Sequence, residues 1–287
     1  MPTTKESIIA QARRNFHLSL CESVLSIADG IATNADASQN SSRFLALEVA
    51  RSLGAKEKAK PAGQNMGNNF EKVVEAFLKE SFTALSEFRP GCWRIFQVGS
   101  RNGNEISQFG QYSHLREIAD VLSKNKALAA SLGNEYSISP DIIVARELVT
   151  DDQFNRSTFL VDGDVAKAAD LRDGPGKLPL LHASVSTKWT LRSDRAQNAR
   201  SEALNLIRNR KGRTPHIVLV TGEPTPSRLS SIALGTGDMD CVYHFALYEL
   251  VAAAQKLNND EALSMLDILI GGKRLKDISD LPLDLAT

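Results

Sequence analysis

The amino-acid sequence predicts an α/β fold in which helices pack around a central β-sheet. Polar and apolar residues alternate from His182 to Lys188, which is typical of a strand, and apolar residues then recur at helical spacing from Ala196 to Ile207. The segment 215–221 contains an apolar run, as expected for a strand in a sheet that is covered on both faces. A chain of 287 residues with 42% hydrophobic residues allows one large domain or two small ones, and we expect a single domain over residues 1–287.

The same periodicities predict the other elements. In chain order they are helices over residues 6–27, 43–53 and 68–88, a strand over 93–98, a helix around 115–122, a strand over 141–149, a strand over 240–245, and helices over 247–257 and 261–270. The proline-rich segment 223–228 is expected to be a stiff loop that presents Arg228. The tail after Lys273 is polar and then interrupted by proline. Residues 148–177 form an insertion that is long for a simple connection between two strands.

Three charged residues at the ends of these elements indicate phosphodiester hydrolysis. Asp141 follows Pro140 at the start of a strand, Lys188 ends the strand that contains Ser186, and Glu202 lies about two turns into the next helix. Carboxylate oxygens are the ligands that Mg²⁺ prefers, and a lysine ammonium group can stabilise charge that develops on a phosphate. The order Pro-Asp, Ser-x-Lys, Glu therefore predicts a metal-dependent nuclease site.

The turn between the strand and the helix carries a second set of candidates, Arg192, Asp194 and Arg195. One interpretation is a charged helix start, with Ser193 or Asp194 as the N-cap. The other is base recognition, because arginine can donate two hydrogen bonds to guanine and aspartate can accept one from cytosine, with an Arg–Asp contact bracing the set. The formal net charge of zero argues against DNA binding by bulk charge alone, but residues 188–213 contain eight Lys or Arg and only two acids.

Composition excludes several other classes. There is no apolar stretch of about 18 residues to span a membrane and no apolar core of a secretory signal at the N-terminus. The three cysteines are widely spaced without a CxxC pair, so we expect reduced thiols and a cytoplasmic protein. No Walker phosphate loop or HExxH motif is present, and the histidines at 182, 216 and 244 are expected to be structural rather than metal ligands.

These residues resemble a known family. Pro140–Asp141, the segment 184–213 and the sequence EPTPSR from Glu223 closely resemble the NgoMIV group of type IIF restriction endonucleases, members of the PD-(D/E)xK superfamily that cut within GCCGGC. The resemblance covers most of the chain from the loop at Asn34 onward and is weakest in the first thirty residues. It implies the restriction-endonuclease fold, a mixed sheet between helices.

The resemblance also implies roles for single residues. Two Mg²⁺ ions would be held by Asp141 and Glu202, with Lys188 next to the attacking water and with Ser186 and Glu71 in the surrounding shell. By the same resemblance, the inner CCGG would be read by Arg192, Asp194 and Arg195. The outer G·C pair would be read by Asp36 and Arg228, with Ser38 nearby. The minor groove would be contacted by Gln64. Without the resemblance, Asp36 and Ser38 fit a surface loop with a helix cap. Glu71 likewise fits either an acid in the first turn of its helix or an accessory carboxylate.

The expected function is Mg²⁺-dependent cleavage of palindromic double-stranded DNA at G/CCGGC, giving 5′-phosphates and four-base 5′ overhangs. The expected partners are three further copies in a homotetramer and a DNA methyltransferase of the same restriction-modification system. The insertion 148–177 would then be buried in a partner subunit; the alternative is that it folds over its own domain. Two other functions stay open, namely a structure-selective repair nuclease on the same core and a non-catalytic DNA-binding regulator.

Overall fold

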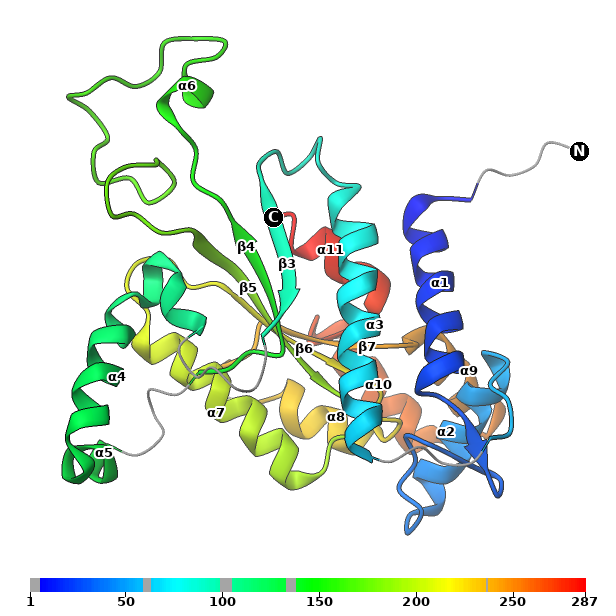
Figure 1. Cartoon of the computed structure of the whole chain (residues 1–287). Coiled ribbons are helices and arrows are strands. Elements are labelled where there is room, and N and C mark those ends of the chain that lie inside the picture. Colours follow the sequence, from blue (N-terminus) through cyan, green and yellow to red (C-terminus); the bar gives the residue numbers. More distant parts are fainter. Residues whose placement is uncertain (1–5, 59–62, 99–104, 133–137, 236) are drawn as a thin grey trace, which may run out of the picture.

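A six-stranded sheet forms the centre of the molecule (Figure 1). The computed structural model describes residues 6–58, 63–98, 105–132, 138–235 and 237–287. In sheet order the strands are β3 (Trp93–Gln97), β4 (Ile142–Arg146), β5 (Leu180–Lys188), β6 (His216–Thr221), β7 (Cys241–His244) and β8 (Leu275–Asp277). β3, β4 and β5 pair antiparallel, whereas β5 to β8 pair parallel, so the sheet is mixed. This confirms the fold expected from the sequence.

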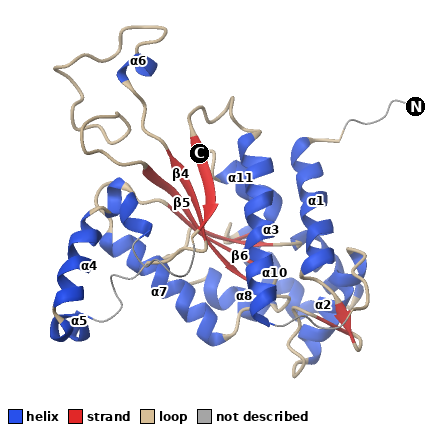
Figure 2. Ribbon diagram, viewed as in Figure 1, coloured by secondary structure: helices blue, strands red, loops and turns tan. Residues whose placement is uncertain are grey.

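Helices cover both faces of the sheet (Figures 1 and 2). The long helices on one side are α1 (Ile8–Ser23) and α3 (Gly63–Thr83), and those on the other side include α7 (Ser193–Asn209), α8 (Pro226–Ala233) and α10 (Asp260–Gly271). The other helices are α2 (Asn40–Ser52), α4 (His114–Lys124), α5 (Lys126–Leu132), α6 (Asp151–Phe154), α9 (Leu247–Lys256) and α11 (Leu281–Asp284). A small hairpin of β1 (Ile27–Ala28) and β2 (Ile31–Ala32) precedes α2. The successive parallel strands explain why α7 and α8 share one face, since their connections have the same hand.

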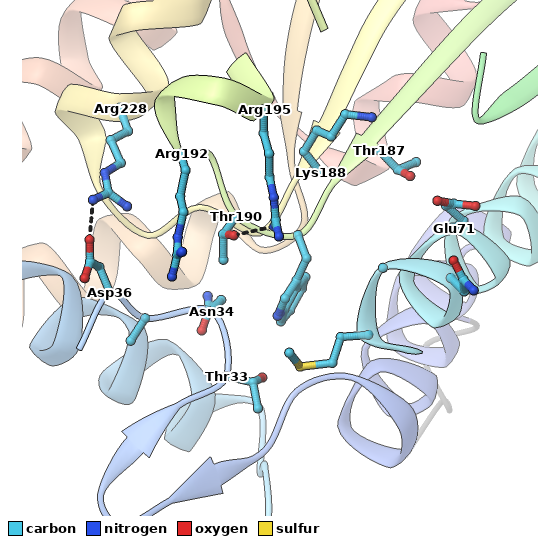
Figure 3. A pocket seen from close by; sticks show the side chains of 15 residues that line it. Thr33, Asn34, Asp36, Glu71, Thr187, Lys188, Thr190, Arg192, Arg195 and Arg228 are labelled. Carbon is cyan, nitrogen blue, oxygen red and sulfur yellow. Dashed lines mark hydrogen bonds and ion pairs between the residues drawn. The ribbon is translucent and has the colours of Figure 1, made fainter. Parts of the chain in front are cut away.

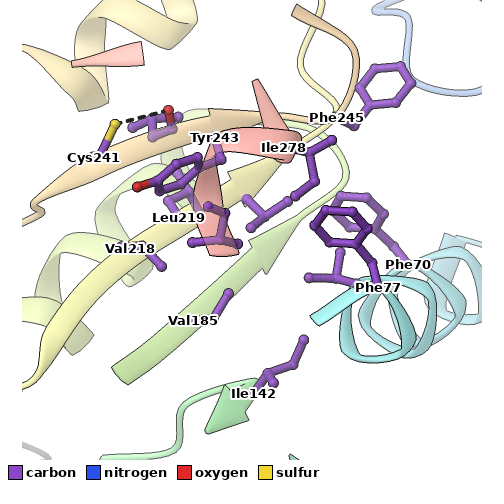
Figure 4. Close-up of a cluster of buried hydrophobic side chains, with 14 of the residues drawn as sticks. Phe70, Phe77, Ile142, Val185, Val218, Leu219, Cys241, Tyr243, Phe245 and Ile278 are labelled. Atoms are coloured by element: carbon purple, nitrogen blue, oxygen red, sulfur yellow. Dashed lines mark hydrogen bonds between the residues drawn. The ribbon is translucent and has the colours of Figure 1, made fainter. Parts of the chain in front are cut away.

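The core lies between the sheet and these helices (Figure 4). Val185 on β5 and Leu219 on β6 are fully buried, as are Phe70 on α3 and Phe245 after β7. Removing each such side chain from water stabilises the fold by about 1.5–3 kcal/mol. The strands that end at the site are therefore held rigidly along their length.

Strand register brings the chemical groups to one edge of the sheet. β4 and β5 are antiparallel, with Ile142 opposite Val185, so the start of β4 lies beside the end of β5. β5 and β6 are parallel, with Lys188 opposite Thr221. Asp141, Lys188 and the residues that follow Thr221 consequently meet at the same edge, although they are far apart in sequence.

Several predicted elements need correction. α3 begins at Gly63 and ends at Thr83, which places Glu71 more than two turns into the helix and not in its first turn. The segment predicted as a proline-stiffened loop becomes helical at Pro226, so Arg228 lies in the first turn of α8. Proline is accepted there because the first helical position needs no N–H. The tail contains β8 and α11, each too short to show a periodicity.

The insertion projects from the body of the molecule as a long loop that carries α6 (Figures 1 and 2). Its base is closed by a bridge between Val149 and Arg172, and Arg172 forms an ion pair with Asp151 at 2.7 Å. Within the insertion, Phe159 and Leu160 are 76% and 62% exposed. The insertion therefore does not fold over its own domain. Within the described residues, no helix is long and apolar enough to cross a membrane.

Candidate active site and DNA interface

Asp141 is the centre of the first cluster. Its Oδ2 accepts hydrogen bonds from the backbone N of Thr187 at 2.7 Å and from Nζ of Lys188 at 2.8 Å, with the hydroxyl groups of Ser186 and Thr187 at 3.4 and 3.3 Å. The end of β5 thus supplies every one of these donors. The aspartate at the start of β4 and the Ser-x-Lys sequence at the end of β5, which were paired on sequence grounds, lie in direct contact.

Two further carboxylates share the same electrostatic environment. Burial, with a contribution from the negative charge of Asp141, raises the pKa of Glu71 to about 7 and that of Glu202 to about 7. Lys188 opposes both shifts. The Oε2 atom of Glu202 is buried without a hydrogen-bond partner. Glu71 from α3 and Glu202 from α7 therefore approach the Asp141–Lys188 pair from the two sides of the sheet.

The three carboxylates act together on Lys188. Burial alone would lower the pKa of this ammonium group, but the negative charges of Asp141, Glu202 and Glu71 outweigh burial, and its pKa is raised. Lys188 therefore stays protonated at neutral pH. A positive charge is thus available at the edge of the sheet where the strands end.

A cavity of about 440 Å³ opens beside this cluster (Figure 3). Glu71 and Lys188 lie along its wall, together with Arg192, Arg195 and Arg228. Figure 3 shows the three arginine side chains extending in the same direction, toward the loop that contains Asn34 and Asp36. The cavity therefore joins a carboxylate–lysine cluster to a row of guanidinium groups.

Arg228 and Asp36 form an ion pair across this cavity. The same aspartate accepts hydrogen bonds from the backbone N and Oγ of Ser38 at 3.0 and 2.7 Å. Hydrogen bonds from Ser38 and from Arg228 lower the pKa of Asp36 well below its usual range, so the carboxylate is ionised. These residues, which the sequence pattern alone placed on a surface loop, come together although Asp36 and Arg228 are 192 positions apart.

The other candidate DNA-binding residues are placed less closely together. Asp194 is exposed in the first turn of α7 and lies outside the cavity lining. Arg195 does not make the expected contact with Asp194. Its Nη1 instead donates a hydrogen bond to Oγ1 of Thr190 at 2.8 Å. The N-cap of α7 is Arg192, not Ser193 or Asp194, and no side chain caps this helix. Gln64 belongs to the first turn of α3, and its side chain lies outside the described residues.

Sequence reasoning missed residues that hold this arrangement together. Thr187 binds Asp141 through its backbone, which no side-chain pattern can reveal. Asn34 is buried, and its Nδ2 donates to the carbonyl of Gly222 at 2.7 Å. Glu223 is fully buried and accepts from the backbone N of Leu191 at 2.8 Å. The only available signal for Glu223 was an acid two residues after an apolar strand.

The histidines take structural positions. Nε2 of His182 lies 2.7 Å from the carbonyl of Leu285, and Nδ1 of His244 accepts from the backbone N of Ala246 at 3.1 Å. Burial lowers the pKa of His182, His216 and His244. Neutral imidazoles in such contacts belong to the packing of the sheet.

Comparison with known proteins covers the same elements. The family model of the NgoMIV restriction enzyme matches residues 16–287, from α1 to the last described residue. The chain belongs to the NgoMIV restriction enzyme family. The type II restriction enzyme NgoMIV of Neisseria gonorrhoeae is 54% identical over 282 residues, which cover 97% of this chain and 99% of that protein. Similarity thus extends into the first thirty residues, where the sequence had indicated the weakest resemblance.

Membership in the NgoMIV family establishes the general activity. The protein is a site-specific deoxyribonuclease of the type II restriction class, and its partner is DNA. Restriction endonucleases generally use a divalent metal ion. Among the residues that the structure describes, no three His, Cys, Asp or Glu side chains converge as a complete metal cage. The carboxylates of the site, Asp141, Glu202 and Glu71, are instead grouped around Lys188.

Proposed function

We propose that this enzyme is Mg²⁺-dependent and cuts double-stranded DNA at G/CCGGC, leaving 5′-phosphates and four-base 5′ overhangs. The observation that carries the proposal is the contact of Asp141 with Lys188, flanked by Glu202 and Glu71, beside a cavity lined by Arg192, Arg195 and Arg228. The proposed specificity is the one that the resemblance to the NgoMIV group implies, and the 54% identity to the type II restriction enzyme NgoMIV supports it.

The donor set fits Mg²⁺. This ion takes one or two carboxylates and keeps several waters, so it does not need a cage of three protein ligands. Asp141 and Glu202 are the proposed ligands, and a cation beside Glu202 would satisfy the buried Oε2 atom that has no hydrogen-bond partner. We propose two ions at each site, with Ser186 and Glu71 in the surrounding shell. When bound, Mg²⁺ polarises the scissile phosphate and lowers the pKa of a water molecule.

The residues of the chain have separate tasks in this reaction. Lys188, protonated and fixed by Asp141, stabilises the negative charge that develops on the phosphate and orients the attacking water. Burial and the charge of Asp141 raise the pKa values of Glu71 and Glu202 to about 7, and a cation held beside these carboxylates would favour their ionised form. The buried end of β5 holds these groups in fixed positions, which lowers the entropic cost of reaching the transition state.

Recognition is assigned to the cavity and the turn beside it. Arg192 and Arg195 would donate to guanines of the inner CCGG, and Asp194 would accept from cytosine. Arg228 and Asp36, with Ser38 beside them, would read the outer G·C pair, and Gln64 would enter the minor groove. The ion pair between Arg228 and Asp36 supports this assignment, because it presents a donor and an acceptor together, as a G·C pair requires.

Assembly and partners follow from the palindromic site. Two copies are needed to cut both strands, and we propose that two such dimers associate as a homotetramer through the insertion 148–177. The exposed Phe159 and Leu160 support this, because large apolar side chains on a projecting loop are stabilised when a partner buries them. We also propose that residues 1–287 fold as one domain and that a DNA methyltransferase of the same specificity protects cellular DNA.

The decisive experiment is digestion of a plasmid that contains GCCGGC, followed by sequencing of the ends. Cleavage should require Mg²⁺, stop with a chelator, and give 5′-phosphates after the first G. A matched plasmid in which the site is changed to GCATGC is the control. Cutting of both plasmids, or preferential cutting of branched DNA, would support the structure-selective nuclease instead, and binding without cutting would support the regulator.

A further inference from the structure

A buried carboxylate that the proposed chemistry does not use lies behind the arginines. Glu223 lies two residues after the end of β6, and it is fully buried. Burial raises the pKa of its carboxyl group above the ordinary value for glutamate. Burying an acid is unfavourable unless its oxygens accept hydrogen bonds. The hydrogen-bond partners of Glu223 therefore indicate its role in the structure.

Each oxygen of Glu223 binds a different segment of the DNA interface. Oε2 accepts from the backbone N of Leu191 at 2.8 Å, directly before Arg192. Oε1 accepts from the backbone N of Thr225 at 3.1 Å, directly before α8. Oε2 also lies 3.7 Å from Nη1 of Arg228 in the first turn of that helix. One side chain therefore connects the turn of Arg192 with the helix of Arg228.

The residue before Glu223 extends this connection. The carbonyl of Gly222 accepts from Nδ2 of Asn34, two residues before Asp36. The backbone N of Gly222 donates to the carbonyl of Lys188 at 3.3 Å. A side chain at position 222 would meet the Trp189 ring at 2.4 Å, so only glycine allows this close approach.

We infer that Glu223 is a positioning residue that fixes the arginines of the inner recognition set relative to Arg228 and Asp36. This inference rests on the proposed function, because it assigns these residues to inner and outer base pairs. Guanidinium groups that read neighbouring base pairs must be spaced to fit both at once. Glu223 maintains this spacing through its contacts at Leu191 and Arg228, and it contributes no contact to DNA itself.

Glu223→Gln tests the inference, because it keeps the shape but replaces one acceptor by a donor and removes the charge. The rate of cleavage at GCCGGC should fall about 10- to 100-fold, as expected for a charge-assisted contact and a small misplacement. The ratio of rates between GCCGGC and ACCGGT, which differ only in the outer pair, should shrink. In an Arg228→Ala background the same substitution should change this ratio little, since the two residues act as a unit.

Asp277→Asn is the matched control. Asp277 is also fully buried and also accepts from backbone N–H groups, but its partners are Leu247, Ser279 and Arg13, away from the arginine row. It should lower the unfolding temperature without changing the ratio of rates. Glu223→Asp, which keeps the charge but shortens the side chain, should reduce the ratio in the same direction as Glu223→Gln.

Two results would overturn the inference in distinguishable ways. If Glu223→Gln lowers the unfolding temperature as Asp277→Asn does, yet leaves the ratio unchanged, Glu223 is a structural residue only. The same conclusion follows if Glu223→Gln does not fold and Glu223→Asp folds with an unchanged ratio. If the wild-type enzyme itself does not prefer GCCGGC, the proposed specificity fails, and this inference fails with it.

Discussion

At the scale of single residues, the site depends on one oxygen atom. Oδ2 of Asp141 receives the backbone N of Thr187 and Nζ of Lys188 at once, so the two strand ends are joined by charge-assisted hydrogen bonds. The carboxylate therefore orients the lysine, and it is also the proposed metal ligand. These uses can be separated from DNA binding, because the arginines lie along the neighbouring cavity.

We expect Asp141→Ala to lower the cleavage rate by about 10³-fold or more, because it removes a metal ligand and releases Lys188. The affinity for GCCGGC duplex should change little, since the arginines remain. Single-turnover cleavage and fluorescence anisotropy on the same duplex measure both quantities. Asp120→Ala, an exposed acid on α4, is the control and should cut normally. Undiminished cutting by Asp141→Ala would remove Asp141 from the site.

Arg192→Ala should weaken discrimination among DNA sequences by roughly 1–3 kcal/mol, the worth of a bidentate guanine contact. Binding to cognate and scrambled duplexes should be compared at one salt concentration. Arg208→Ala, near the other end of α7 and exposed, should leave discrimination unaltered. An equal loss on cognate and scrambled DNA would instead make Arg192 a phosphate contact.

His182 makes stability depend on pH. Burial, assisted by the positive charges of Arg89 and Arg213 and by His216, lowers its pKa to about 4. The unfolded imidazole binds a proton below about pH 6.5, whereas the folded one does not, so stability is full above that pH and is lost as the pH falls toward 4. This loss amounts to about 3 kcal/mol. His182→Gln should show a correspondingly flatter decline in urea unfolding, and an identical pH profile would contradict this assignment.

At the scale of elements, the first helix is tied to the last strand of the sheet. Arg13 on α1 donates to Asp277 at the end of β8 at 2.8 Å, and to Glu249 on α9 at 2.6 Å. Asp277 is fully buried, so its charge depends on this partner. Helix α1, which lies within the first thirty residues whose role was not evident from the sequence, thus connects β8 with α9 through Arg13.

Arg13→Ala should lower the free energy of unfolding by about 3–5 kcal/mol, because it leaves a buried carboxylate without its counter-charge. Denaturant unfolding at neutral pH measures this. Arg14→Ala is the control on the same helix, since Arg14 is 58% exposed and forms an ion pair with Glu6 at the surface. A loss below about 1 kcal/mol for Arg13→Ala would show that this connection carries little stability.

The elements also show what could be predicted from sequence and why. β5 and α7 were predicted because the alternation from His182 to Lys188 and the helical spacing from Ala196 to Ile207 are long enough to recognise. Hairpin β1–β2 and strand β8 have two or three residues each, which is too few for a period. Asp141, Lys188 and Glu202 were assembled from chemistry and order along the chain.

Other parts of the site had no local signal. The pairing of Asp36 with Arg228 is a product of the tertiary fold and was reached only through family resemblance. Thr187 acts through its backbone, and Asn34 through a carbonyl partner far along the chain. Contacts of this kind depend on strand register, which no single segment of sequence specifies.

At the scale of the whole molecule, the insertion lies outside the body formed by the sheet and its helices. It projects beyond the sheet, closed at its base by Arg172 and Asp151, and carries exposed apolar side chains (Figure 2). Exposed apolar side chains on a projecting loop suit the proposed contact with another subunit. The candidate active site lies at the opposite end of β5 and includes no residue of the insertion.

Replacing both Phe159 and Leu160 by Ser should convert the tetramer to dimers, because it removes the apolar area that would be buried between subunits. Light scattering gives the mass. On plasmids with one or two sites at equal site concentration, the wild type should cut the two-site plasmid faster and respond to added cognate oligonucleotide, whereas the variant should not. A dimeric wild type with equal rates on both plasmids would rule out this assembly while leaving the nuclease assignment intact.

The ion pair between Asp36 and Arg228 also has a consequence for the order in which the site forms during synthesis of the chain. Its two halves are 192 residues apart, and synthesis proceeds at about 5–20 residues per second, so the aspartate waits roughly 10–40 seconds for the arginine to be made. Glu71 and Lys188 are likewise far apart in the sequence. A growing chain therefore carries the residues for hydrolysis before it can hold the pair assigned to the outer bases. Arg228 is therefore the last of the proposed site residues to be made.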